Sequence, residues 1–86
     1  MEKREILRKI VEIISKETGI PEAEIRADSA LMDDLDMSSL EILVMVERME
    51  TAFSLRFSMT DMQEIITVND LVELIGKLKQ QRGNGR

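Results

Sequence analysis

The sequence predicts an all-α fold, a small bundle of four helices in one domain, and three observations support this prediction. Apolar residues recur at the i, i+3, i+4 and i+7 spacing of one helix face. No segment alternates polar and apolar residues clearly enough to predict a strand. Serine or threonine followed three residues later by an acid or glutamine, the capping-box pattern, precedes several apolar runs. A chain of 86 residues buries about 60 to 65% of its unfolded surface, too little for a deep enclosed active site.

The first predicted helix covers residues 2 to 17, and Gly19 ends it, because glycine readily adopts the left-handed conformation that follows a helix. Its apolar stripe consists of Ile6, Ile10, Ile13 and Ile14. A loop then spans residues 20 to 37, and a loop of this length in a compact domain usually has a function or contains a short helical turn. The apolar side chains expected to hold it against the bundle are Ile20, Ile25, Leu31 and Leu35.

Capping boxes predict the starts of the other three helices. Ser38 begins a helix that continues to about Phe53. Thr60 and Thr67 begin the same pattern further along the chain. They predict a short third helix and a fourth helix, over residues 61 to 66 and 68 to 79. The inward stripe of the fourth helix is expected to be Val68, Leu71, Val72 and Ile75.

Residues 1 to 80 are expected to form a single domain, with residues 81 to 86 as a flexible polar tail. The chain has no cysteine, so it has neither a disulfide framework nor a thiolate metal site. Its first residues lack the apolar run of a signal peptide, and its longest apolar run, Ile42 to Val46, is too short to cross a bilayer. We therefore expect a soluble, cytoplasmic protein without stable membrane insertion.

The acidic residues are concentrated in the middle of the chain. The net charge is −5, but residues 17 to 76 contain 14 acids and three arginines, a charge of −11, whereas the two ends together carry +6. This field would repel a phosphate backbone, and the basic ends have no neighbouring aromatic side chains on which bases could stack, so no nucleic-acid partner is expected. The charge favours transient docking onto basic protein surfaces. The alternative is that these acids form an ordinary solvated surface.

Two adjacent serines, Ser38 and Ser39, join the acidic loop to the second helix. The chain contains no histidine and no cysteine, so neither hydroxyl has an imidazole base to activate it for nucleophilic attack. A serine here is interpreted as an attachment point rather than a catalyst, and the protein as a non-enzyme. For the Ser-Ser-Leu tripeptide alone, the simpler interpretation is a helix start with nothing attached.

The acids before the serines, Asp33, Asp34 and Asp36, do not match a metal-binding loop. If Asp34 were the first residue of a calcium loop, Ser39 would stand at the sixth position, which needs glycine. Met45 would stand at the twelfth position, which needs glutamate. No dedicated metal site is therefore expected.

The stretch DDLDMSSLEILVMVERMETAF, residues 33 to 53, resembles the modified region of the acyl carrier protein family, and ITVNDLVELI, residues 66 to 75, resembles the start of that family's last helix. Ser39 matches the family's modified serine, Leu40 the leucine after it and Phe53 the closing aromatic residue. The resemblance covers nearly the whole domain and implies a bundle with a long first loop and a short third helix. It also implies that Ser39 carries covalent 4'-phosphopantetheine from coenzyme A, with acyl cargo as a thioester.

The chain departs from the family's pattern beside this serine. Ser38 replaces the aspartate that the family's transferases commonly contact, and Asp36 occupies the usual glycine position. On the second helix, Val44 stands where the family often has glutamate, and Arg48 adds a base. These differences indicate a specialised carrier with its own set of partners.

Two groups of candidate functional residues lie on and near the second helix. The candidate partner contacts are Asp36, Ser38, Leu40, Glu41, Val44, Glu47 and Arg48, with Glu50 as a further acid. The apolar stripe expected to face the bundle and to line an acyl pocket consists of Leu43, Val46, Met49 and Phe53. For each of these four, an ordinary core position is the alternative. Flexible methionines would make such a core adaptable, among them Met45, Met49, Met59 and Met62.

We therefore expect a monomeric acyl carrier that presents its cargo to enzymes of fatty-acid, polyketide or specialised lipid and secondary metabolism. Its expected partners are a phosphopantetheinyl transferase and acyl-transferring, condensing or acyl-activating enzymes with basic docking surfaces. The main alternative is an unmodified interaction module in which Ser39 only starts a helix. A weaker alternative is a membrane-surface module in which anionic lipid meets Lys3, Arg4, Arg8 and Lys9 of the first helix.

Overall fold

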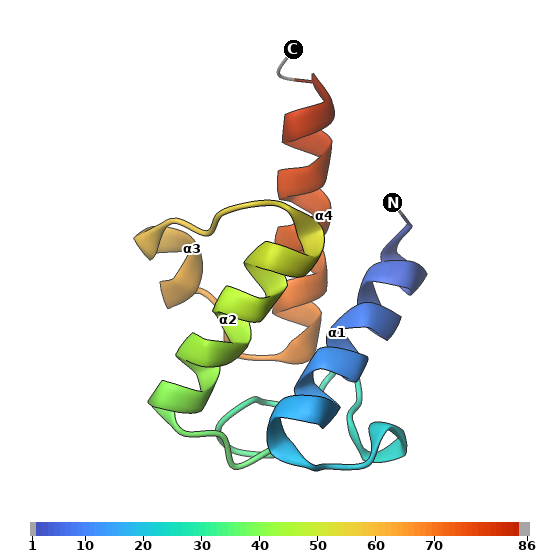
Figure 1. Ribbon diagram of the computed structural model, residues 1–86, viewed down its shortest axis with the longest axis vertical. Helices are drawn as coiled ribbons and strands as arrows, with labels where there is room; N and C mark the ends of the chain where they lie inside the picture. Colours follow the sequence, from blue (N-terminus) through green and yellow to red (C-terminus); the bar gives the residue numbers. More distant parts are fainter. Residues whose placement is uncertain (1, 85–86) are drawn as a thin grey trace.

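Three long helices, α1, α2 and α4, form the framework, and α1 lies against both of the others (Figure 1). The computed structural model describes residues 2–84. Its elements are α1 (Lys3–Thr18), a 3₁₀ turn η1 (Glu22–Glu24), α2 (Ser39–Phe53), α3 (Met59–Gln63) and α4 (Val68–Asn84). Within the described residues the one β-type pairing is an isolated bridge between Ala30 and Thr67. The predicted all-α fold, with a long first loop and a short third helix, is confirmed.

The core lies between the long helices, and the loop between α1 and α2 closes one end of it (Figure 1). Ile6, Ile10 and Ile14 of α1 are completely buried, whereas Ile13 lies half-buried at the edge of the stripe. The four residues predicted for the inward stripe of α4 are all buried: Val68, Leu71, Val72 and Ile75. Burial of one large aliphatic side chain contributes about 1.5–3 kcal/mol. This apolar set is therefore the main source of the bundle's stability.

Local signals set both ends of α1. At its start, the Glu5 carboxylate accepts a hydrogen bond from the backbone N–H of Glu2 at 3.3 Å. At its end, Gly19 has φ 82° and donates its N–H to the carbonyl oxygen of Ser15 at 2.8 Å. The helix therefore matches the predicted span to within one residue at each end.

The loop between α1 and α2 is attached to the start of α4 by backbone hydrogen bonds. The N–H of Leu31 donates to the carbonyl oxygen of Ile66 at 2.9 Å, and the N–H of Val68 donates to that of Ser29 at 3.0 Å. η1 is the short helical turn expected within this loop. Ile20 is half-buried. The apolar loop side chains that are buried are Ile25, Leu31, Leu35 and Met37, so Met37 joins the predicted anchors.

The start of α3 differs from the prediction. Ser58, rather than Thr60, caps the helix: its Oγ accepts the N–H of Asp61 at 3.0 Å, and the Asp61 carboxylate accepts the N–H of Ser58 at 2.9 Å. The sequence of this segment contains two overlapping capping-box patterns, Ser58 with Asp61 and Thr60 with Gln63. The pattern whose second residue is a charged carboxylate is the one that forms. The helix begins two residues earlier than predicted, at Met59, and ends three residues earlier, at Gln63.

α4 continues to Asn84, beyond its predicted end at Lys79 (Figure 1). The residues after Lys79, Gln-Gln-Arg, are good helix formers, so no local signal ends the helix there. The Nζ of Lys79 donates a hydrogen bond to the carbonyl oxygen of Phe53 at 2.9 Å and so caps the last turn of α2 with a positive charge. The last two residues of the predicted tail lie outside the described residues, and the flexibility of that tail stays a prediction.

Two described residues other than glycine have a left-handed backbone conformation, Asp36 and Ser54, each with φ 56°. Ser54 follows the last residue of α2, and its N–H donates to the carbonyl oxygen of Glu50. With a Cβ present, this conformation costs about 1–2 kcal/mol, because the Cβ approaches a carbonyl oxygen. The end of α2 therefore contains local strain that a glycine would not have.

The substitution Ser54→Gly is expected to raise the free energy of unfolding by about 0.5–1 kcal/mol. The free energy gained by removing the strain exceeds the free-energy cost of the extra entropy that glycine gives the unfolded chain. Urea unfolding of the two proteins measures this difference. Ser54→Ala keeps the Cβ and serves as the control, which should show no gain. Equal stability of Ser54→Gly and wild type would show that the conformation is not strained.

Asp70 is expected to make the stability depend on pH in the acidic range. Hydrogen bonds from the backbone N–H groups, that of Thr67 first and then that of Ile66, lower the pKa of its carboxyl, and partial burial opposes this effect only in part. The folded pKa thus lies below the unfolded one. The carboxylate therefore stabilises the fold above the unfolded pKa, and this contribution is lost as the pH falls through the folded pKa.

Asp70→Asn keeps an oxygen that can accept the same N–H groups but does not titrate. We expect the variant to lose less unfolding free energy than the wild type between about pH 7 and about pH 3. Urea unfolding of both proteins at each pH provides the comparison. If the two proteins lose the same amount, the Asp70 carboxylate has no part in the acid sensitivity.

Candidate functional site

Ser38 and Ser39 have different roles at the start of α2. The Ser38 Oγ accepts the N–H of Glu41 at 3.1 Å, and the Glu41 carboxylate accepts the N–H of Ser38 at 2.8 Å, so the predicted capping box is formed. Ser39 is the first residue of the helix and is exposed. No hydrogen bond of its hydroxyl is found among the described backbone groups and side chains. The Ser39 hydroxyl is therefore the one that is available for attachment of another group.

The surroundings of Ser39 suit an attached anion. The backbone N–H groups of Ser39 and Leu40, in the first turn of α2, have no acceptor among the described residues. They point out of the helix end that carries the positive pole of its dipole. A phosphate on the Ser39 oxygen would lie beside these donors, as anions commonly do at helix starts. The residues present thus fit a phosphate-linked group such as the one that the family resemblance implies.

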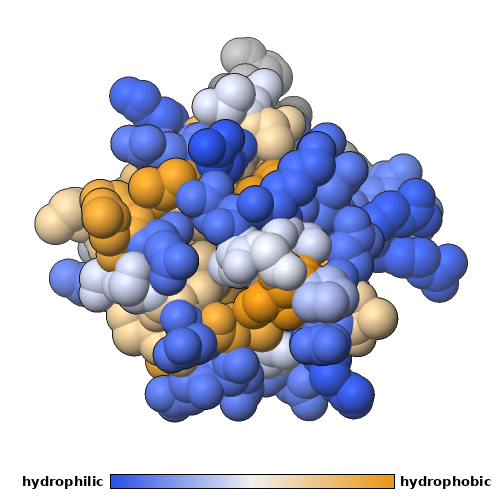
Figure 2. Space-filling model, turned by 60° about the horizontal axis from the view of Figure 1, so that its bottom comes forward, coloured by the Kyte–Doolittle hydropathy of each residue, from blue (hydrophilic) through white to orange (hydrophobic). Residues whose placement is uncertain are grey.

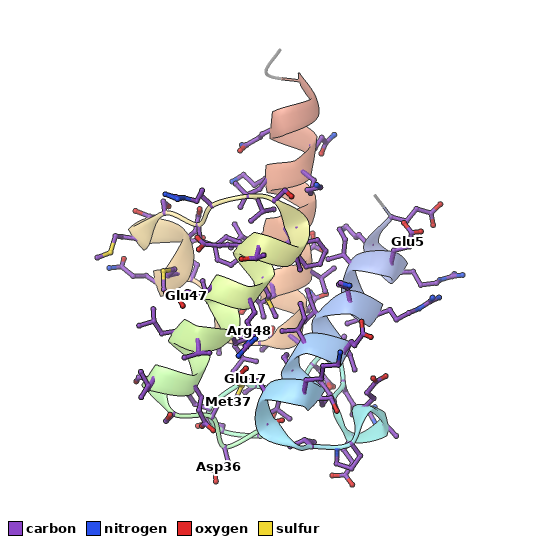
Figure 3. The ribbon with its side chains drawn as sticks, viewed as in Figure 1. Glu5, Glu17, Asp36, Met37, Glu47 and Arg48 are labelled. Atoms are coloured by element: carbon purple, nitrogen blue, oxygen red, sulfur yellow. The ribbon has the colours of Figure 1, made fainter. Side chains whose placement is uncertain are left out.

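The backbone that leads into Ser39 is firmly anchored. Leu35 and Met37 are both buried, and the N–H of Met37 donates to the carbonyl oxygen of Leu31 at 3.0 Å. Asp36 lies between them in the left-handed conformation, and its side chain is exposed and points away from the bundle (Figure 3). Met37 was not singled out from the sequence, although a lone apolar residue within a polar run was a usable signal.

The acidic residues around Ser39 divide into two kinds. The Asp34 carboxylate accepts the N–H of Ala30 at 2.7 Å, and that of Glu41 belongs to the capping box, so both stabilise the local backbone. Asp33 and Asp36 are exposed, and no hydrogen bond of either side chain is found in the described part of the chain. No group of three His, Cys, Asp or Glu residues within residues 2–84 is placed to hold a metal ion.

The candidate partner contacts on α2 do not share one surface. Glu47 is exposed and projects from the side of α2 away from α1, whereas Arg48 turns toward α1 (Figure 3). The Nε of Arg48 lies 2.7 Å from a carboxylate oxygen of Glu17, whose side chain is only 18% exposed. The Glu50 carboxylate accepts the N–H of Phe57 at 2.9 Å and orders the segment after α2. Arg48 and Glu50 therefore have partners within the chain that the sequence did not reveal.

The apolar stripe of α2 is partly different from the one predicted. Val46, Met49 and Phe53 are buried, as expected, and Met49 is fully inaccessible. Leu43 is 47% exposed, so the prediction that it faces the bundle is wrong. The fully buried Met45 faces the bundle instead: Met45, Val46, Met49 and Phe53 form the buried face of α2, and Leu43 lies at the margin of that face.

Apolar side chains also reach the surface near the start of α2. Figure 2 brings the loop end of the molecule forward and shows apolar patches within a mainly hydrophilic surface. Leu40 is 69% exposed, and Val44 is half-buried. The large apolar side chains that are exposed among the described residues include Met32, Leu40, Leu43, Met59 and Ile66. No helix within residues 2–84 combines the length and the apolar character needed to cross a membrane.

Comparison with known proteins gives consistent matches along most of the chain. A family model described as a phosphopantetheine attachment site matches residues 8–75. The acyl carrier protein of Kineococcus radiotolerans is 38% identical over 74 residues, which cover 86% of this chain and 91% of that protein. The acyl carrier protein of Thermotoga maritima is 33% identical over 75 residues, which cover 87% of this chain and 93% of that protein.

A solved structure of the acyl carrier protein from Enterococcus faecalis has the same fold. It matches with a TM-score of 0.75 at 28% identity and covers 91% of this chain and 99% of that chain. Members of this family interact with a phosphopantetheinyl transferase and with biosynthetic enzymes. The chain belongs to the acyl carrier protein family, whose members are carriers rather than enzymes and hold 4'-phosphopantetheine covalently.

Proposed function

We propose that Ser39 is the residue to which 4'-phosphopantetheine is attached, and that the protein presents an acyl or related carboxylic group to separate enzymes. One observation carries the choice of residue. The neighbouring Ser38 hydroxyl accepts the Glu41 N–H and caps α2, whereas the exposed Ser39 hydroxyl has no such bond among the described groups. The first-turn N–H groups beside Ser39 favour an attached phosphate.

The attachment reaction needs a partner enzyme and coenzyme A. The Ser39 oxygen forms a bond to the phosphorus of the pantetheine phosphate, the pyrophosphate bond of coenzyme A breaks, and adenosine 3',5'-bisphosphate leaves. The transferase supplies the base for the hydroxyl proton, because this chain has no histidine. When bound, the group supplies the thiol on which a carboxylic cargo is held as a thioester, and a chain without cysteine has no thiol of its own.

The proposed cargo enzymes belong to fatty-acid, polyketide or specialised lipid metabolism and have basic docking surfaces. The charge of −11 over residues 17 to 76 would attract such surfaces from a distance. The exposed side chains of Leu40 and Glu47 supply an apolar and a charged contact on α2. We further propose a cytoplasmic monomer, with residues 1 to 80 as its domain.

A second candidate function is an unmodified interaction module. The observation that favours it is that Ser38 stands where an aspartate would be expected. The structure shows that Ser38 forms the cap that an aspartate would form, so the fold persists although the acid beside Ser39 is absent. In this alternative, the same acidic surface docks onto a basic partner and nothing is attached to Ser39.

Intact mass spectrometry after incubation with coenzyme A and a broad-specificity phosphopantetheinyl transferase separates the two functions. We expect a gain of one phosphopantetheine in the wild type and in Ser38→Ala, and none in Ser39→Ala. Ser38→Ala loses its cap, at a cost of about 1 kcal/mol, so circular dichroism is needed to show that it remains folded. A gain in Ser39→Ala would move the attachment to Ser38, and no gain in any folded protein would favour the unmodified module.

A second experiment tests whether the core takes up the acyl chain. If the buried α2 stripe lines an acyl pocket, the NMR signals of the Met45 and Met49 methyl groups should shift progressively as a saturated cargo is lengthened, because these flexible side chains must repack around it. The Met59 methyl group, on a side chain that is 78% exposed, is the internal control and should not follow chain length. Core signals that are unchanged by chain length would show that these side chains are ordinary core residues.

A further inference from the structure

We infer that Asp36 is the acid through which the transferase recognises this chain, and that its carboxylate binds a cationic side chain of that enzyme. The inference rests on the proposed attachment at Ser39 and adds to it a specificity-determining residue. It concerns the loading step alone, and not the later enzymes that handle the cargo.

The fold itself has no need of an aspartate at this position. Asp36 has φ 56°, a conformation that glycine adopts without strain and that aspartate tolerates better than most other residues with a Cβ. Its carboxylate is exposed, and no hydrogen bond or ion pair of it is found among the described side chains and backbone groups. An exposed aspartate whose carboxylate has no contact in the described part of the chain is available to bind a partner.

The other acids near Ser39 are occupied or more distant along the chain. The carboxylates of Asp34 and Glu41 accept backbone N–H groups at 2.7 and 2.8 Å. Ser38 carries no charge, and its Oγ is used in the cap. Asp36 is therefore the nearest acid before Ser39 in the chain whose carboxylate is not bound to the local backbone.

The backbone around Asp36 also holds this carboxylate in place. Leu35 and Met37 on either side are buried, and Met37 is only 3% exposed. The N–H of Leu35 donates to the carbonyl oxygen of Ala30 at 3.0 Å, and that of Met37 donates to the carbonyl oxygen of Leu31 at 3.0 Å. A charge on an anchored backbone loses less conformational freedom on binding than a charge on a mobile one.

The chemistry of the loading enzyme supplies the complementary charge. Coenzyme A carries a pyrophosphate and a ribose phosphate, so the enzyme that binds it must present cationic groups around the point where Ser39 enters. A carboxylate near Ser39 contacts these cationic groups, which form a basic rim around the entry point, as the chain docks. Contacts between opposite charges at such a rim strengthen the encounter and set its orientation.

Two substitutions of Asp36 separate recognition from stability. Asp36→Asn removes the charge and keeps a side chain that tolerates the left-handed conformation. Asp36→Gly removes the charge and also relieves the strain, so its urea midpoint should rise. Loading by coenzyme A and a broad-specificity transferase, followed by intact mass as the protein concentration is varied, gives KM and kcat for each protein. We expect both variants to raise KM about tenfold with kcat nearly unchanged.

Matched controls exclude general effects of charge and strain. Asp33→Asn removes the same charge from an exposed position further from Ser39 along the chain and should change KM by less than about twofold. Ser54→Gly removes the Cβ from a residue with the same φ of 56° at the other end of α2, and this variant should leave KM unchanged. Ser38→Asp, added to Asp36→Asn, places an acid beside Ser39 in a residue that still caps the helix, and should restore KM to within about threefold of the wild type.

The possible outcomes distinguish this inference from the function on which it rests. Normal loading of Asp36→Asn, or an equal loss in Asp33→Asn, would overturn the role of Asp36 and leave the attachment at Ser39 intact. Absence of loading of the wild-type protein would overturn the proposed attachment and the role of Asp36 together. A KM defect in both Asp36 variants that Ser38→Asp repairs would establish Asp36 as the recognition acid.

Discussion

The fold depends on the pairing of two distant segments, residues 27–31 of the long loop and residues 66–69 at the start of α4. Backbone hydrogen bonds run between them in both directions, and Leu31 and Val68 are buried beside them. A long loop without regular structure needs partners for its backbone groups, and α4 supplies them here. Because this loop leads directly into α2, the position of Ser39 is set by a helix that comes much later in the chain.

Acidic side chains serve two purposes in this protein. Some accept hydrogen bonds from backbone N–H groups. Glu41, Asp61 and Asp70 do so at the starts of helices, and Glu50 does so for the segment after α2. Others, such as Asp36 and Glu47, are exposed and lie near or on α2. All of them contribute to the negative field of the central region, but the second kind alone has side chains available for direct contact. A count of charges along the sequence therefore overstates the number of partner contacts.

The sequence predictions succeeded where the signal was local. Gly19 and Ser38 set helix boundaries through their own backbone or side-chain bonds, and both were identified correctly. The start of α3 was wrong because two capping boxes overlap there and only their geometry decides between them. Leu43 was assigned to the inward stripe because it is apolar at a helical spacing, but the rotation of α2 against its neighbours places it at the edge.

The sequence by itself determined the class of fold, the four helices, the buried stripes of α1 and α4, and a serine at the start of α2 as the candidate attachment point. These features depend on periodicity and capping, which act over a few residues. The tertiary structure alone decided that Arg48 pairs with Glu17, that Lys79 caps α2, and that Asp36 is exposed with a left-handed backbone conformation. The two contacts join residues from different helices, and the conformation of Asp36 depends on backbone angles. The spacing of residues along one helix predicts neither the contacts nor the angles.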